Sequence, residues 1–368
     1  MDAKRDFPFQ KPRLHQSFQL LIVPETDEIQ LQSEGRTLRI KPCNSNKLLQ
    51  DLIALLDGTH TVDEIVHALT HFDESQVLDS LQRLYEARVL EDGAPVIAPL
   101  SEDQQQYYAS QLTFFSQFTN DPYSFQAKMA QSRVAVLGVG SIGSLLLGSL
   151  AESGVGQLVA VDFEEERSVK AKNELRRQEY TSRNPWTRYR EITLLDRSPR
   201  LIAELAKESQ VVVLTLDQQN LDLMERVNEA CIQTSTVWLP VGIRAWEGYI
   251  GPTVLPRQTA CYKCYDLRMK ANLTHYEAYL VYERHLRAGN KPCLFGSLAE
   301  FGRIVADIAA IEITKLLTNF SPPTTPGRIF TIDFLSLAAE FHDVLKLPRC
   351  PACGEPSRQI PMMKPWSE

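Results

Sequence analysis

The stretch from Val134 to Asp162, VAVLGVGSIGSLLLGSLAESGVGQLVAVD, predicts a strand, a glycine-rich turn, a helix and a second strand that ends at an acid. Gly138, Gly140 and Gly143 form the pattern G-x-G-x-x-G. In a βαβ nucleotide-binding unit the first glycine permits a tight turn, the second lets the backbone approach a phosphate, and the third lets the helix pack closely on the strand. Asp162 lies about twenty residues further on, where such a unit places the carboxylate that binds ribose hydroxyls. The stretch predicts a nucleotide site that NAD, FAD or ATP could fill.

Length and composition narrow the class of protein. A chain of 368 residues can hold two domains, and it has no apolar run approaching the length of a membrane span. Its N-terminus lacks the apolar region of a secretory signal, so we expect a cytoplasmic protein that does not enter a membrane. A formal net charge of -7 argues against a general nucleic-acid binder.

Residues from about 17 to 93 are predicted to form a small separate domain of the α+β type. Three short strands, at 18–23, 29–32 and 37–40, precede three helices that begin near 48, 61 and 73. Thr61 and Glu64 form a capping-box signature for the second helix. This order favours a winged helix-turn-helix. The third helix carries too few cations to bind a DNA backbone, so nucleic acid is not the expected partner.

The same segment resembles the PqqD-like recognition element of enzymes that modify ribosomally made peptides (RiPPs). The resemblance rests on three strands, the helix that begins T-V-D-E-I, and a last helix that ends near Leu90-Glu91. In that family the leader of the precursor peptide adds as a strand to the sheet edge, against the third helix. The resemblance implies that residues 17–93 bind a precursor leader; the alternative is a packing domain without a ligand.

Beyond a linker at 94–100, the chain is predicted to be helical from Gln104 to Gln131. Strands are expected at 190–194, 211–216 and 237–241, and a helix around 201–206. Strands that alternate with helices indicate a doubly wound, mostly parallel sheet of the α/β class. Asp217 directly follows a buried strand, at the carboxyl end where such sheets place ligand-binding groups.

Two C-x-x-C pairs, Cys261/Cys264 and Cys350/Cys353, are the most specific metal signal in the chain. Two such pairs complete a closed tetrahedral zinc site, which would hold the distant C-terminal segment on the domain. A redox role is the rival interpretation, but neither pair clearly opens a helix of a thioredoxin-like unit. Cys43 and Cys231 are expected to be buried small hydrophobic residues.

Taken together, residues from about 104 to 354 resemble the ThiF/MoeB family, relatives of ubiquitin-activating enzymes. The matching motifs are RVAVLGVGSIGS, VVVLTLD, VGIRAWEGYIGPTVLPRQTACYKC, IVADIAAIEITKLL, GRIFTIDF and LPRCPACG. The resemblance implies a Rossmann-like sheet and a homodimer that binds ATP with Mg²⁺ and adenylates a peptide carboxylate. It also implies that Asp162 holds the ribose, that Asp217 holds Mg²⁺, and that the four paired cysteines hold Zn²⁺. The nucleotide-binding turn would comprise Gly138, Gly140, Ser141, Ile142 and Gly143.

The sequence departs from the family pattern in its phosphate-binding cations. The segment between Asp162 and Asn184-Pro185 is too short for both the N-L-x-R-Q motif and the lysine that follows it in relatives. Either Lys172 is that lysine, by its distance to Asn184, or Asn173, Arg176 and Arg177 are a shifted remnant of the motif. Ser110 stands where relatives lend an arginine to the partner's ATP. The candidates for the phosphate contacts are Lys172, Arg176, Arg177 and Arg183, and the alternative is that this stretch is a solvated basic helix.

Two further features have both a functional and a structural interpretation. Cys293 lies where some relatives form a thioester, but we expect it to be buried and unreactive because no histidine is close in sequence. The insert 267–290 lies where a crossover loop covers the substrate in relatives; it would contact an acidic core peptide or simply be an amphipathic helix.

These features predict a leader-binding domain, 1–100, joined to an adenylating domain, 101–368. The first hypothesis is a RiPP-modifying enzyme of the pantocin-type architecture, which activates a glutamate or aspartate side chain of the core for dehydration or cyclisation. The second is a leader-binding scaffold that delivers the precursor to a YcaO-type cyclodehydratase. A MoeB-like activator of a sulfur carrier would not need the leader-binding domain. A nicotinamide dehydrogenase would leave the paired cysteines and Asp217 unexplained.

Overall fold

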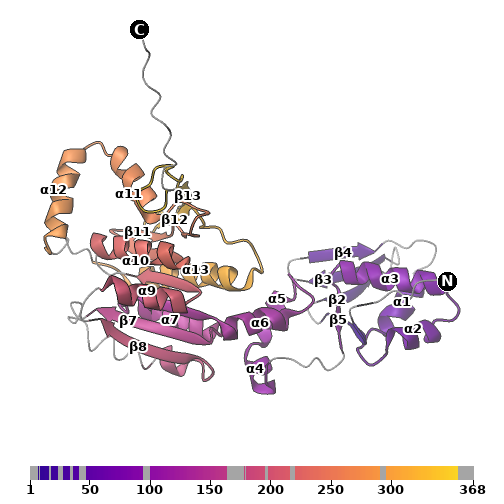
Figure 1. The fold of residues 1–368 in the computed structure, drawn as a ribbon. Coiled ribbons are helices and arrows are strands. Elements are labelled where there is room, and N and C mark those ends of the chain that lie inside the picture. The colour runs from indigo at the N-terminus through magenta and orange to yellow at the C-terminus, as the bar shows by residue number, and fades with distance from the viewer. Residues whose placement is uncertain are drawn as a thin grey trace, which may run out of the picture. The chain divides into compact units, whose positions relative to one another are not determined.

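The computed structural model describes residues 7, 9–15, 18–23, 28–33, 36–40, 47–93, 100–163, 178, 180–194, 198–215, 220–290 and 296–354. The chain divides into two compact units, Met1–Ala127 and Lys128–Glu368 (Figure 1). By contacts, the residues that follow the linker up to Ala127 group with the N-terminal unit. Within the described ranges, no helix combines the length and the apolar character needed to cross a bilayer.

The N-terminal unit has two small sheets and a set of short helices. Strands β2 (Gln19–Val23), β3 (Glu28–Ser33) and β4 (Arg36–Ile40) form an antiparallel sheet, and β1 (Pro12–Leu14) pairs with β5 (Leu90–Asp92). The helices are α1 (Lys47–Ala54), α2 (Val62–Ala68), α3 (Glu74–Glu86), α4 (Glu102–Tyr107) and α5 (Ala109–Phe115). The predicted order of three strands and three helices is confirmed. The winged helix-turn-helix assignment itself stays a prediction.

Local sequence explains how this unit forms. Thr61 caps α2: its backbone N–H donates to Glu64 Oε2 at 2.7 Å, and the Glu64 N–H donates to Thr61 Oγ1 at 3.3 Å. Leu31 on β3 is fully buried against apolar side chains of α1, α2 and α3. Leu38 and Ile40 of β4 also pack against this core, so the core covers β3 and β4.

The aromatic segment 104–131 is not one helix. It forms α4, α5 and α6 (Pro122–Gln131), with a turn at 116–121 before Pro122. Proline lacks a backbone N–H and clashes with the preceding turn, so a helix can begin there but cannot continue through it. The predicted helical character of 104–131 is confirmed, in three helices and not in one.

The C-terminal unit is an eight-stranded mixed sheet with helices on both faces. Its strands are β6 (Arg133–Leu137), β7 (Gln157–Phe163), β8 (Arg188–Leu194), β9 (Val211–Thr215), β10 (Val237–Arg244), β11 (Glu247–Ile250), β12 (Arg328–Asp333) and β13 (Ala339–Asp343). Its helices are α7 (Ser141–Glu152), α9 (Pro199–Glu208), α10 (Leu221–Thr234), α11 (Tyr262–Ala271), α12 (Tyr276–Arg287) and α13 (Ala299–Thr318).

The order of the strands is β13-β12-β11-β10-β9-β6-β7-β8. From β10 to β8 neighbouring strands are parallel, which confirms the predicted mostly parallel sheet; β11, β12 and β13 add an antiparallel extension. Alternate residues of each strand enter two separate cores. Val134, Val136, Leu239 and Val241 pack with α7 and α13, whereas Ala135, Leu137 and Trp238 pack with α9 and α10.

Glu312 on α13 is a buried carboxylate that fixes the loop before β12. It is 3% exposed, and it accepts bonds from the backbone N–H and the hydroxyl of both Thr324 and Thr325, at 2.7–3.0 Å. Lys315 pairs with it at 2.7 Å. Burial raises the pKa of Glu312, but the bonds from Lys315, Thr324 and Thr325 outweigh burial and hold this pKa below its usual value.

Glu312→Gln is expected to lower the free energy of unfolding at pH 7 by about 2–4 kcal/mol, because it removes a charge from a satisfied buried network. The folded pKa is depressed, so the contribution of Glu312 is complete above its unfolded pKa of about 4.3 and disappears as the pH falls through the folded pKa. Urea unfolding at pH 7 and in acid should show the variant and wild type converging in acid. Glu300→Gln, at an exposed position on the same helix, is the control. An equal fall in the free energy of unfolding in both variants would contradict a special role for the buried carboxylate.

Candidate functional site

The glycine turn begins where β6 ends. Gly138 has φ +97°, and its N–H donates to Val161 O of β7 at 2.8 Å. A Cβ atom on Gly138 would lie 1.8 Å from the carbonyl oxygen of Thr215, at the end of the described part of β9. Both the left-handed backbone and this close approach require glycine. The tight turn predicted for the first glycine is therefore present.

Gly143 lets the first turn of α7 pack closely against the glycine turn. A Cβ atom there would lie 1.9 Å from Gly138 O and 2.6 Å from Thr215 Oγ1. Thr215 in turn donates its hydroxyl to Gly138 O. The close packing expected of the third glycine is present, although its partners are the turn and β9 rather than β6.

The structure brings Asp162 to the same sheet edge as the glycine turn. In the parallel pair of β6 and β7, Leu137 lies opposite Val161, so the next residues along, Gly138 and Asp162, are level with each other. Asp162 shares the strand face of Leu158 and Ala160, which pack with α7. One of its oxygens, Oδ1, accepts a bond from the Phe163 N–H at 2.9 Å.

Helix α7 begins at Ser141, with Gly140 as its N-cap. Ile142 is 2% exposed and its side chain belongs to the core, so only its backbone can serve a nucleotide. The unpaired N–H groups of a helix N-terminus and the helix dipole favour a bound phosphate. In the described part of the predicted site, the N-terminus of α7 and the carboxylate of Asp162 therefore lie on the same face of the sheet, at the edge where β6 and β7 end. Lys172, Arg176, Asp217 and Cys293 lie outside the described residues.

Gly138→Ala is expected to destabilise the C-terminal unit by about 2–4 kcal/mol and to abolish ATP binding, because the methyl group would overlap the backbone of Thr215. Unfolding in urea and titration calorimetry with ATP measure the two effects. Gly289→Ala is a matched control, because Gly289 also has a positive φ, +81°, but a Cβ there meets nothing within 4 Å. An equal loss of stability and of ATP binding in the two variants would show that the backbone conformation, and not the close approach to Thr215, is responsible.

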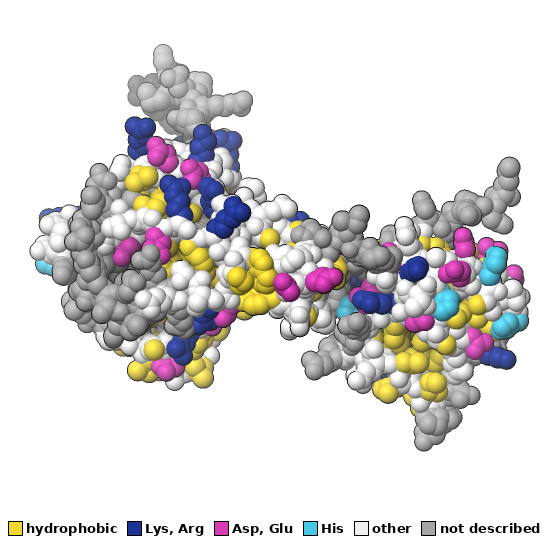
Figure 2. Space-filling model, turned by 90° about the horizontal axis from the view of Figure 1, so that it is seen from below, with side chains coloured by type: hydrophobic (Ala, Val, Ile, Leu, Met, Phe, Trp, Pro, Cys, Tyr) yellow, Lys and Arg dark blue, Asp and Glu magenta, His cyan; other side chains and the backbone are white. Residues whose placement is uncertain are grey.

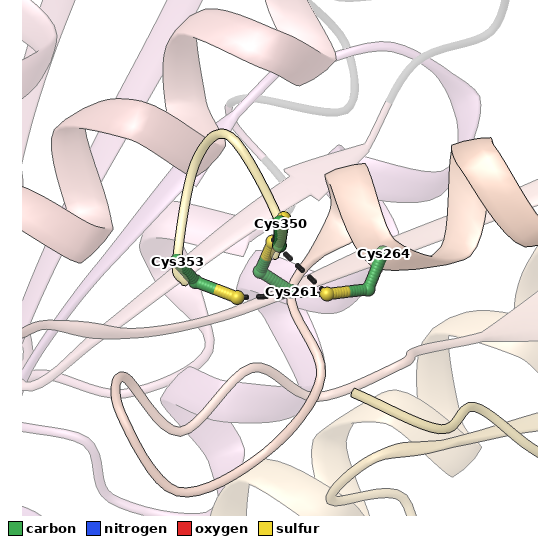
Figure 3. Close-up of side chains that lie close together, drawn as sticks. All are labelled: Cys261, Cys264, Cys350 and Cys353. Carbon is green, nitrogen blue, oxygen red and sulfur yellow. Dashed lines mark hydrogen bonds between the residues drawn. The ribbon is translucent and has the colours of Figure 1, made fainter. Parts of the chain in front are cut away.

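The four paired cysteines meet in one cluster, although each cysteine of the second pair lies 89 positions after its counterpart in the first (Figure 3). Cys261 is the N-cap of α11 and Cys264 lies in its first turn, whereas Cys350 and Cys353 come from the turn that follows β13. The Sγ–Sγ distances are 3.9 Å between Cys261 and Cys264, 3.7 Å between Cys261 and Cys350, and 3.5 Å between Cys264 and Cys353.

These distances fit one tetrahedral metal ion. Four sulfur atoms at the usual Zn–S distance of about 2.3 Å lie about 3.8 Å apart, whereas a disulfide would bring two of them to about 2.05 Å. The Leu347 N–H also donates to Cys264 Sγ at 3.4 Å, as backbone groups around zinc thiolates do. The residues present therefore fit a closed structural site with no open position for a reactant.

The surroundings shift the pKa values of these thiols in different directions. Burial raises the pKa of Cys350, but hydrogen bonds from Cys353 and Ala352 outweigh it and hold this pKa below its usual value. Burial raises the pKa of Cys261 to about 11, and burial and the neighbouring sulfur atoms raise the pKa of Cys353 further still. Cys231 is fully buried and burial raises its pKa strongly, which confirms its interpretation as a small core residue. Cys43 lies outside the described residues.

The insert 267–290 forms the end of α11 and the whole of α12. Its basic residues Lys270 and Arg287 are held by internal ion pairs: Lys270 pairs with Asp266 and Glu283, and Arg287 pairs with Glu283 and Glu225. Asp266 and Glu283 are buried. These two cations therefore fasten α12 to α10 and α11, which favours a structural role for them over contact with an acidic peptide.

Comparison with known proteins gives relatives for most of the chain. The model of the ThiF family matches residues 108–354. Molybdopterin-synthase adenylyltransferase of Escherichia coli K12 is 23% identical over 245 residues, which cover 62% of this chain and 90% of that protein.

Solved structures are similar over nearly the full length of the chain. Escherichia coli MccB in complex with MccA-N7isoASN has a TM-score of 0.68 at 17% identity, covering 94% of this chain and 99% of MccB. The complex of MccB with ATP has a TM-score of 0.67 at 18% identity, covering 94% and 100%. At this identity the likeness establishes the fold, which includes the N-terminal unit. With the family match over more than half of its length, the chain belongs to the ThiF family.

Proposed function

We propose that this protein is an ATP-dependent enzyme that adenylates a carboxylate of a ribosomal precursor peptide. The observation that carries the proposal is the sheet edge at which the glycine turn, the N-terminus of α7 and Asp162 meet, within a chain of the ThiF family. The adenylyltransferase relatives and the ATP complex of MccB support ATP as the nucleotide.

In the proposed reaction an oxygen of the peptide carboxylate attacks the α-phosphorus of ATP. The bond between this phosphorus and the bridging oxygen of pyrophosphate breaks, and an acyl-adenylate forms. A nucleophile of the peptide then attacks the acyl carbon, and AMP leaves. A carboxylate is a poor electrophile, so its conversion to an acyl-adenylate is what makes dehydration or cyclisation of a glutamate or aspartate side chain feasible.

Each predicted residue has a role in that reaction. Backbone N–H groups from Gly138 to Gly143 would bind phosphate, and Asp162 would bind the ribose hydroxyls. Asp217 would hold Mg²⁺, which neutralises charge on the phosphates. Lys172 and Arg176 would stabilise the charge that develops on the leaving pyrophosphate. Zn²⁺ at the four cysteines would serve the fold and take no part in the chemistry.

For the N-terminal unit we propose binding of the precursor leader at the edge of the β2-β3-β4 sheet, against α3. Arg36, the first residue of β4, donates to Ala87 O at the C-cap of α3 at 2.8 Å, so this end of the edge strand contacts the end of the helix. The other edge strand, β2, exposes Leu20, Leu21 and Ile22. Hydrophobic side chains also gather over this unit in Figure 2. The complex of MccB with MccA supports a peptide partner.

Hydrogen exchange with and without the leader peptide tests this site. A leader that adds to β4 should protect the amides of 36–40 and slow exchange in α3, while 19–23 stays unchanged. Protection of 19–23 instead would move the site to the β2 edge. Tight binding without new protection in either strand would contradict strand addition.

The family resemblance further implies a homodimer in the cytoplasm. The C-terminal unit exposes large apolar side chains that a second copy could cover, among them Leu298, Ile311, Leu335, Leu337 and Leu345, each more than half exposed. Light scattering should give twice the chain mass of 41.7 kDa.

A leader-binding scaffold for a YcaO-type enzyme is the second candidate function. Ser110 at the arginine position and the short segment after Asp162 favour it. The two candidates differ in ATP turnover. The enzyme should form AMP and pyrophosphate when it is given the precursor. The scaffold should bind the leader without consuming ATP.

A further inference from the structure

Arg244 is the last residue of β10, a strand that continues past the level at which the described part of β9 ends. In the parallel pair of β9 and β10, Val241 lies opposite Thr215, the residue that contacts the glycine turn. Arg244 comes three residues later, so at a rise of about 3.3 Å per residue it lies about 10 Å past the level of Thr215. Its side chain is exposed.

The alternation of β10 places Arg244 on the face opposite α7. Leu239 and Val241 pack with α7 and α13, whereas Trp238 packs with α9, α10 and α11. Arg244 is an even number of residues from Trp238 and shares its face. The N-terminus of α7, which would hold the ATP phosphates, begins on the other face. Arg244 therefore reaches the same sheet edge from the face opposite the one that would hold the triphosphate.

Tyrosine side chains fix the orientation of this guanidinium. Tyr249 lies across the hairpin with its ring against Gly242, where an added Cβ would be 2.6 Å from the Tyr249 hydroxyl. Arg244 Cζ is 5.5 Å from the centre of the Tyr249 ring. Desolvation lowers the pKa of Arg244, but Tyr265 and Tyr249 outweigh this and raise it. A guanidinium stacked on a ring keeps its N–H edge available for a planar anion.

Three neighbouring cations on this side of the sheet have carboxylate partners, and Arg268 on α11 donates to a backbone carbonyl. Lys263 pairs with Glu225 and Asp266, Lys270 pairs with Asp266, and Arg287 pairs with Glu283. Within the ranges that the structure describes, Arg244 forms no such ion pair; Glu247, its partner across the hairpin, attracts it without reaching ion-pair distance. Arg244 is thus oriented by aromatic rings while an anionic partner from elsewhere can approach it.

We propose that Arg244, oriented by Tyr249 and Tyr265, binds a carboxylate of the peptide substrate that is not the one to be adenylated. A carboxylate in a bidentate pair with arginine is a weakened nucleophile, so the reacting carboxylate must lie elsewhere. The reacting carboxylate would lie beside the glycine turn, at the level of Thr215, and the offset of about 10 Å from there to Arg244 corresponds to two or three residues of extended peptide. Arg244 would be a positioning residue that selects a core with an acidic residue two or three positions from the modified one. This inference rests on the proposed function.

Synthetic peptides test this selection. The probe is Gly-Glu-Gly-Gly-Glu, acetylated and amidated, together with the two analogues in which either glutamate is glutamine. Saturation-transfer NMR in the presence of AMP measures binding, and calorimetry measures the affinity for ATP. Wild type should bind the diacid at least about tenfold more tightly than either analogue. Arg244→Gln should lose this preference, and Arg244→Lys should keep part of it because it retains the charge without the planar fork.

Arg268→Gln is the matched control, because Arg268 on α11 donates to the Leu345 carbonyl and faces no ligand in this account. It should bind the peptides as wild type does. ATP affinity should stay within twofold of wild type in all three variants. An unchanged diacid preference in Arg244→Gln, or equal binding of all three peptides by wild type, would overturn the inference. A parallel loss of ATP affinity would make Arg244 a phosphate ligand and overturn it too. Failure of wild type to bind ATP would instead count against the proposed function.

Discussion

Cys350→Ser is expected to abolish zinc binding and to cause a larger loss of stability in the C-terminal unit than any other substitution described above. Cys350 and Cys353 hold the turn after β13 on α11, and the four sulfur atoms lie within 4.8 Å of one another. Binding of a structural zinc ion supplies about 10–16 kcal/mol in small zinc domains, and this energy contributes to folding because the unfolded chain lacks the site. That energy is comparable to the whole stability of an ordinary domain, about 5–15 kcal/mol.

Metal analysis and thermal unfolding measure this prediction. The purified protein should contain one zinc ion per chain, and Cys350→Ser should contain none and unfold at a much lower temperature. Cys231→Ser is the matched control, since Cys231 on α10 is also fully buried in this core but is not one of the four clustered cysteines. Retention of stoichiometric zinc by Cys350→Ser would contradict a four-cysteine site.

Asp217→Asn is expected to reduce adenylation by at least about 100-fold, because the variant keeps the size of the side chain but loses the charge that would hold Mg²⁺ beside the phosphates. Pyrophosphate exchange into ATP, driven by the precursor peptide, measures this step. The zinc content and the unfolding temperature should remain those of wild type, which separates a role in the reaction from a role in folding.

Asp222→Asn is the control for this prediction. Asp222 lies five residues further along, in the first turn of α10, and forms a half-exposed pair with Arg287 that contributes at most about 1 kcal/mol. Its variant should exchange pyrophosphate as wild type does. Undiminished exchange by Asp217→Asn would remove Asp217 from the reaction.

The sequence predicted those parts of the fold whose signals are local. The buried strands β6, β7, β9 and β10 are continuous apolar runs, and the glycine turn follows directly on one of them. β13, AEFHD, was missed because all five residues are exposed and no apolar alternation marks the strand. β11 was missed because it has four residues, one of them glycine.

The candidate site likewise combines residues with a local sequence signal and residues whose role depends on tertiary contacts. Each C-x-x-C pair is a local signal, and the closeness of the two pairs confirms the cluster that they predicted. Arg244 was missed because what makes it notable is tertiary: Tyr249 reaches it across a hairpin and Tyr265 from a helix about twenty residues away in the chain. The roles of Lys172, Arg176 and Asp217 stay predictions from the sequence, since these residues lie outside the described part of the chain.

The products formed from ATP in the presence of the precursor peptide test the central claim most directly. Adenylation predicts AMP and pyrophosphate in equal amounts, formed only when the peptide is present, with pyrophosphate exchange that is lost in Asp217→Asn. Formation of ADP and phosphate, or tight peptide binding with no consumption of ATP, would contradict the account.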